Sequence, residues 1–185
     1  MSTALKMKRA ALVLICALAP AVASAQENPF STHTKWMYAG LKFMLLRSAE
    51  KMPEENYTFK PTDAVRSFGQ IIGHAADAQY RFCAIALGET NPAPGIEKNK
   101  TSKAELIAAL KAATAYCDRA YDSMSDASAA QLVKLDGRDF PRLGVLDVND
   151  LHNSEHYGNL ITYMRMKNIV PPSSEPGFNV QPPKK

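Results

Sequence analysis

Apolar residues recur every three or four positions along four segments of the chain, a spacing that places them on one face of an α-helix. These predicted helices run over residues 34–53, 67–87, 102–124 and 143–168. The chain shows neither the apolar–polar alternation of strands nor an internal repeat. We therefore predict an all-α four-helix bundle that occupies residues 26–172.

Local signals support the ends of the second and third helices. Ser67-Phe-Gly-Gln70 and Ser102-Lys-Ala-Glu105 both have the spacing of a capping box, in which the first side chain accepts from the amide three residues later. Gly88 is a typical residue after a helix C-terminus. Between the third and fourth helices, the pattern is compatible with a short helix at 127–134, which Gly137 and Pro141 would end.

The first 25 residues have the three parts of a secretory signal peptide. A basic start with Lys6, Lys8 and Arg9 precedes an apolar run of about ten residues, and Ala23-Ser-Ala25 has the small residues of a cleavage site. We therefore expect a secreted or periplasmic protein. No later segment approaches the roughly 20 apolar residues that cross a bilayer, so no membrane partner is expected after cleavage.

Charge and length narrow the classes of function. Three of the cations behind the formal net charge of +4 lie in the predicted signal peptide, which leaves about +1 for the rest of the 185 residues. A nearly neutral exported chain is not expected to bind nucleic acid. The remaining length suits one domain with one core, followed by a Pro-rich tail at 173–185 that we expect to be flexible.

Two cysteines remain after the predicted cleavage, Cys83 and Cys117. An even count in an oxidising compartment favours a disulfide, and two buried free thiols are the alternative. The connector at 89–100 is long enough to reach about 40 Å when extended, so it could return along a whole helix. The second and third helices would then run parallel and bring both cysteines to one level. The disulfide and the crossover are therefore one linked hypothesis.

Three histidines are candidate metal ligands. His152 and His156 are four residues apart on the fourth predicted helix, which stacks their imidazoles on one face. His74, on the second predicted helix, is the best candidate for a third ligand. Three neutral imidazoles suit Zn, Ni, Fe or Cu and leave a coordination position open; we expect Zn or Ni. His33 lies in a polar segment, and we expect it to be exposed.

Four polar residues close to these histidines are candidates to orient the imidazoles or to act in catalysis. A metal-bound imidazole normally donates its other N–H to such a group. Each of the four could instead be an ordinary surface residue. They are Asp77, Asp150, Glu155 and Asn159.

Two other metal motifs compete with this interpretation. His152-Asn-Ser-Glu-His156 fits the inverted zinc-protease signature, with Glu155 as general base and a downstream carboxylate as third ligand. The only downstream carboxylate is Glu175, in the Pro-rich tail. A di-iron bundle needs an acidic residue three positions before each histidine, and none stands there.

Two segments resemble the DinB/YfiT-like bundle proteins. Phe59-Lys-Pro-Thr through Val65-Arg-Ser-Phe-Gly-Gln-Ile-Ile-Gly-His74, with Ala84-Ile-Ala-Leu-Gly-Glu89, resembles their second helix. His152-x-x-x-His156-Tyr-Gly-Asn, with Tyr163-Met-Arg165 and Ile169-Val-Pro-Pro, resembles their fourth. The resemblance spans residues 34–172. It implies an up-down-down-up bundle and a divalent metal held by His74, His152 and His156.

The resemblance also suggests a reaction class. Characterised relatives include metal-dependent transferases that activate a low-molecular-weight thiol such as bacillithiol or mycothiol, and relatives often form homodimers. This chain has Tyr157 and Asn159 where the family often has Arg and Gln. We therefore consider two functions for the three-histidine site. It activates a thiol or water nucleophile on an unidentified small molecule, or it binds a metal or small molecule without turnover.

Overall fold

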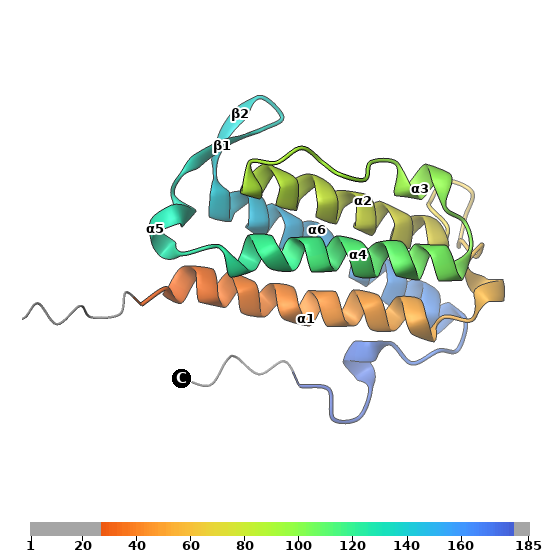
Figure 1. Cartoon of the computed structure of the whole chain (residues 1–185). Coiled ribbons are helices and arrows are strands. Elements are labelled where there is room, and N and C mark those ends of the chain that lie inside the picture. Colours follow the sequence, from red (N-terminus) through yellow and green to blue (C-terminus); the bar gives the residue numbers. More distant parts are fainter. Residues whose placement is uncertain (1–26, 180–185) are drawn as a thin grey trace, which may run out of the picture.

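Four long helices form the bundle of the computed structural model, which describes residues 27–179 (Figure 1). They are α1 (Pro29–Lys51), α2 (Phe68–Leu87), α4 (Lys103–Asp122) and α6 (Arg142–Met166). α4 and α6 each pack against both α1 and α2. The prediction of an all-α four-helix bundle is thus confirmed. The predicted signal peptide lies outside the described residues. Among the helices that are described, none is long and apolar enough to span a bilayer.

The chain direction follows the predicted up-down-down-up order. The segment after α1, which includes the 3₁₀ helix η1 (Glu54–Asn56), leads into α2. The long connector then runs back along α2, and it includes the one-turn helix α3 (Ile96–Asn99) before α4 begins (Figure 1). α2 and α4 therefore run parallel, and α3 lies against α2 near the start of that helix.

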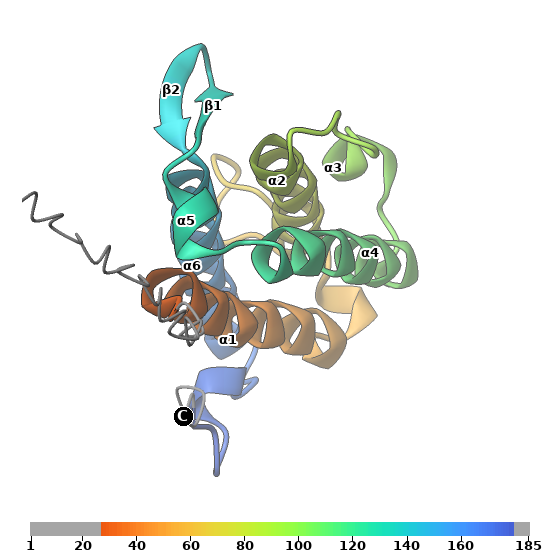
Figure 2. The same ribbon diagram turned by 60° about the vertical axis from the view of Figure 1, so that its left-hand side comes forward.

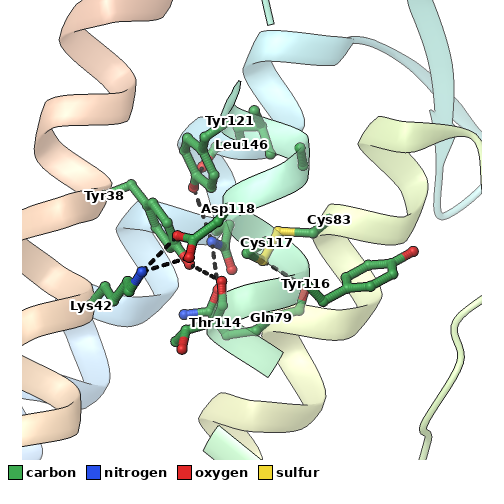
Figure 3. Close-up of a disulfide and its surroundings, with 12 residues drawn as sticks. Tyr38, Lys42, Gln79, Cys83, Thr114, Tyr116, Cys117, Asp118, Tyr121 and Leu146 are labelled. Carbon is green, nitrogen blue, oxygen red and sulfur yellow. Dashed lines mark hydrogen bonds and ion pairs between the residues drawn. A yellow bond between two sulfur atoms is a disulfide. The ribbon is translucent and has the colours of Figure 1, made fainter. Parts of the chain in front are cut away.

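A disulfide between Cys83 and Cys117 joins α2 to α4, with the two Cα atoms 5.2 Å apart (Figure 3). Both cysteines are completely buried in a cluster of apolar residues contributed by α2, α4 and α6. They lie at corresponding positions near the C-terminal ends of two parallel helices. The structure thus contains both parts of the linked hypothesis, the crossover and the bridge.

The boundaries of α2 follow from its sequence. The Ser67 hydroxyl accepts from the Gln70 amide, and the Gln70 side chain accepts from the Ser67 amide, so both bonds of the capping box are present. Gly88 ends the helix with a φ of 73°, a left-handed conformation that glycine adopts without steric cost. Phe68 and Ile72 are fully buried and turn one face of α2 into the core.

α1 begins five residues earlier than the apolar pattern predicted. Pro29 occupies its first turn, where the missing amide costs nothing. The carboxylate of Asp126, far away in the sequence, accepts from the amides of Phe30 and Ser31 and caps this end. Such a tertiary cap has no local sequence signal. His33 is exposed, as expected.

A β-hairpin replaces most of the short helix that we considered at 127–134. The helix is only the single turn α5 (Asp126–Ala129), and strands β1 (Leu132–Leu135) and β2 (Arg138–Pro141) then pair antiparallel. Asp136 and Gly137 connect them with φ values of 50° and 78°. These values suit the tight hairpin turn that Asp-Gly favours. Gly137 is therefore a turn residue, and the absence of strands was a wrong prediction. The hairpin projects beyond the bundle (Figure 2).

The described part of the C-terminal tail, which we expect to be flexible, contacts α1. The 3₁₀ helix η2 (Pro172–Ser174) packs against α1. The Glu175 carboxylate then accepts from Lys51 at 2.5 Å, and the ring of Phe178 stacks on Phe43. Residues 180–185 lie outside the described part.

Candidate metal centre

Three imidazoles converge between α2 and α6. His74 comes from α2, and His152 and His156 come from adjacent turns of α6. The Nε2 atom of His152 lies 3.1 Å from Nε2 of His74 and 3.1 Å from Nε2 of His156. One nitrogen of each ring belongs to a group of potential ligand atoms that all lie within 4.8 Å of one another. The structure therefore brings together the three histidines that the sequence singled out.

Glu97, on α3, orients the first of these rings. Its Oε2 atom lies 2.9 Å from Nδ1 of His74, and its Oε1 atom accepts from Nε of Arg66 at 2.8 Å. Burial alone raises the pKa of Glu97, but the hydrogen bonds from Arg66 and His74 outweigh it and hold that pKa below its usual value. An ionised carboxylate can only accept, so in the neutral form of His74 the proton is on Nδ1 and Nε2 keeps a free lone pair.

Sequence reasoning missed Glu97 because it lies in the connector, 23 residues from His74. The available signal was indirect. A connector that returns along α2 must pass beside His74, and Glu97 is an acidic residue in that segment. Gly73 makes the approach possible, because a Cβ atom there would lie 2.8 Å from Cα of Glu97.

Asp77 does not contact His74, which corrects the predicted role of this residue. Its carboxylate accepts from the backbone amides of Gly95, Ile96 and Glu97, at 2.8, 2.8 and 2.9 Å. Asp77 therefore affects His74 only indirectly, through α3. It fixes the backbone of α3, and α3 carries the carboxylate that orients the histidine.

The other two rings differ in how their Nδ1 atoms are placed. The side-chain amide nitrogen of Asn159 lies 3.4 Å from Nδ1 of His156, so Asn159 lies beside that ring. A half-turn of the amide would present its oxygen to an Nδ1 proton. Nδ1 of His152 is buried without a hydrogen-bond partner among residues 27–179.

Electrostatics keep the histidine pair of α6 in the form that binds metals. Burial, with the neighbouring His156 and His74 rings, lowers the pKa of His152 to about 3. Burial and the His74 ring also lower the pKa of His156. Both rings are therefore neutral at pH 7 and can offer lone pairs to a cation.

A pocket of about 580 Å³ opens at His156. Its wall is mostly polar and includes both Glu97 and Asn159. Glu155, a further candidate from the sequence, is exposed and also lines this pocket. The centre is thus accessible to a small molecule from this side.

Asp150 faces away from the histidines, so its predicted place at the site is wrong. Its Oδ1 atom accepts from the Tyr121 hydroxyl at 2.8 Å, in a buried polar cluster next to the disulfide. Burial raises the pKa of Asp150 to about 8. Although Asp150 is only two residues from His152, the helix turns its side chain towards α4.

The third ligand of an inverted zinc protease is not available. Glu175 forms ion pairs with Lys51 and Arg47 of α1, and His74 occupies the place where a third ligand is needed. The Tyr157 hydroxyl accepts from the Ser173 amide and so anchors the tail to α6.

Comparisons with known proteins agree with this architecture. The sequence profile of the DinB superfamily matches residues 43–160. A DinB-like protein from Bacillus cereus superposes with a TM-score of 0.63 at 16% identity, covering 81% of this chain and 95% of its own. A DinB-like protein from Bacillus subtilis gives a TM-score of 0.61 at 19% identity, with 74% and 92% covered. No curated protein sequence matches the chain. At these identities the two structures show a shared fold.

Proposed function

Because the chain belongs to the DinB superfamily, we propose that it is a metal-dependent enzyme whose ion is held by His74, His152 and His156. The observation that carries the proposal is the convergence of the three Nε2 atoms, with two separations of 3.1 Å. Two nitrogens that share a tetrahedral Zn at about 2.05 Å are roughly 3.3 Å apart. The two separations at His152 are close to this value, and the ligand nitrogens of all three rings lie within 4.8 Å of one another, so a small closure of the His74–His156 pair would let all three bind one zinc or nickel ion.

The donor chemistry supports the same assignment. Three imidazole nitrogens facing one another cannot all be satisfied by hydrogen bonds to each other, because each neutral ring has only one N–H. On His74, that N–H is already used by the Glu97 carboxylate. A divalent cation would satisfy the three remaining lone pairs at once.

A bound divalent ion lowers the pKa of a coordinated water or thiol, which supplies a nucleophile at neutral pH. The pocket at His156 has room for a small second reactant. Glu155, on the wall of that pocket, is our candidate to accept the proton of the nucleophile. We therefore propose transfer or hydrolysis on a small-molecule substrate, with a thiol or water as nucleophile.

We further propose that the protein functions outside the cytoplasm. The disulfide between Cys83 and Cys117 supports this location, because such bridges persist mainly in oxidising compartments. The sequence of the first 25 residues supports it independently.

Metal analysis of the untagged protein tests the first half of the proposal. We expect one equivalent of zinc or nickel per chain, and loss of the metal in His156→Ala. A protein that is purified without metal, and does not take up added zinc or nickel, would refute metal binding.

A panel of thiol-transfer and hydrolysis assays, with His156→Ala as the inactive control, tests the second half. Metal-dependent turnover that the variant lacks would support the enzyme. Stoichiometric metal without turnover in any assay would favour the other function, a bundle that binds a metal or small molecule without catalysis.

A further inference from the structure

A second hollow of about 730 Å³ adjoins the pocket at His156. It lies between the segment that precedes α2, the first turn of α2, and α3 with the residues after it. The two hollows share four lining residues, Lys60, Arg66, Gln70 and Glu97. They therefore meet at the Arg66–Glu97 ion pair, whose carboxylate also contacts His74.

The two hollows differ in charge. The pocket at His156 is lined by two cations and three carboxylates, a formal charge of −1. The second hollow is lined by four cations and only the Glu97 carboxylate, a formal charge of +3. The four cations are Lys60, Arg66, Lys98 and Lys100. An extended small molecule would thus meet a strongly positive surface at the end far from the histidines.

Two of these cations are available to a ligand. Arg66 is bound to Glu97, and Lys60 pairs with Asp63. Lys98 and Lys100 form no ion pair within 4.0 Å in the described part of the chain, although the charge of Lys100 helps to lower the pKa of the nearby Glu105 carboxyl. Ser67 lines the same hollow, and its hydroxyl, which accepts from the Gln70 amide, keeps an O–H that can donate a further hydrogen bond.

We propose that this second hollow, which we call the basic pocket, binds a carboxylate or phosphate group of the substrate, while the reacting part of the substrate lies at His156. Ammonium groups beside a hydroxyl donor are the chemistry that recognises such anions. The placement of the reacting part rests on the proposed function. Anion binding itself requires no metal, so the basic pocket and the proposed function can be tested separately.

Titration of the full chain with inorganic phosphate and with succinate, by calorimetry at low ionic strength, tests the basic pocket. The protein is first treated with EDTA, so that neither anion can coordinate a metal. The test variant is K98Q/K100Q. The matched control is K111Q/K134Q, which removes two exposed lysines elsewhere on the surface.

We expect at least one anion to bind the wild type, and K98Q/K100Q to bind it about tenfold or more weakly. The control should bind it as the wild type does. A preference for succinate or for phosphate identifies which anionic group the substrate carries. Equal affinity in wild type and K98Q/K100Q, an equal loss in the control, or no binding of either anion would overturn the basic pocket.

Metal affinity, measured on the same samples, separates this inference from the proposed function. K98Q/K100Q should keep the metal affinity of the wild type, because neither lysine contacts a histidine. Anion binding without metal binding would refute the proposed function and leave the basic pocket intact. Metal binding without anion binding would refute the basic pocket and leave the metal-binding half of the proposed function intact.

Discussion

The Glu97 carboxylate lies 2.9 Å from Nδ1 of His74, although α3 carries one residue and α2 the other. This contact joins the crossover connector to the candidate metal centre. Its position depends on Asp77, which holds the backbone of α3, and on Gly73, which lets α3 approach. The connector that makes α2 and α4 parallel therefore also completes the surroundings of one ligand.

Replacement of Glu97 by glutamine should weaken metal binding by about 10- to 100-fold, because the neutral amide no longer raises the basicity of His74. Competition with a chromophoric chelator measures the affinity. The control is Glu89→Gln, which removes a carboxylate from the other end of the same connector, where it pairs with Arg119. Equal affinities in the two variants would contradict the role of Glu97.

Asp77→Asn should loosen α3 without removing any group that contacts a histidine. The asparagine nitrogen cannot accept from the Glu97 amide, which loses its hydrogen-bond acceptor at a cost of about 1 kcal/mol. Hydrogen exchange at residues 95–97 should accelerate, and metal affinity should fall less than in Glu97→Gln. Unchanged exchange at these amides would show that other contacts hold α3.

The parts that the sequence predicted well depend on neighbours along the chain. The capping box at Ser67 lies within one turn, and the spacing of His152 and His156 is a property of one helix. The parts that it missed depend on tertiary contacts. The Glu97–His74 contact exists only after the connector has returned along α2.

Two wrong predictions have a different origin. Asp150 is close to His152 in sequence, but two residues along a helix correspond to a rotation of about 200°, which turns it towards Tyr121. The hairpin had a local signal in Asp136-Gly137, a dipeptide that favours a tight turn. We read Gly137 as the end of a helix, because the flanking strands are only four residues long.

Removal of the disulfide should lower the free energy of unfolding by about 4 kcal/mol, because the bridge closes a loop of 34 residues in the unfolded chain. Denaturant unfolding of Cys83→Ala/Cys117→Ala measures the change. Metal affinity should stay constant, since Cys83 is nine residues from His74, roughly 14 Å along α2. If metal affinity fell together with the free energy of unfolding, the disulfide would also be needed to hold the metal centre in place.

Asp150 should make the metal-free protein less stable as the pH rises. Its pKa is about 8 in the folded protein and 3.8 as a free side chain, so between these values only the folded state keeps the proton. The stabilisation is complete below pH 3.8 and is lost as the pH approaches 8. From pH 5 to pH 8 the wild type should lose of the order of 3 kcal/mol relative to Asp150→Asn. Contributions from the histidines cancel in this difference, and urea unfolding at both pH values measures it. Parallel pH profiles would contradict the buried neutral carboxyl.

Gly73→Ala should displace α3 and reduce metal affinity, although it adds a single methyl group. The new Cβ atom would lie 2.8 Å from Cα of Glu97, so backbone must move, and Glu97 would move away from His74. The matched control is Gly158→Ala on α6, where the added methyl group meets no atom within 4 Å. That control should keep its metal affinity and gain up to about 1 kcal/mol of stability from the better helix propensity of alanine. Chelator competition and thermal unfolding of both variants test the pair. Equal metal affinities would show that α3 can shift without carrying Glu97 away from the histidine.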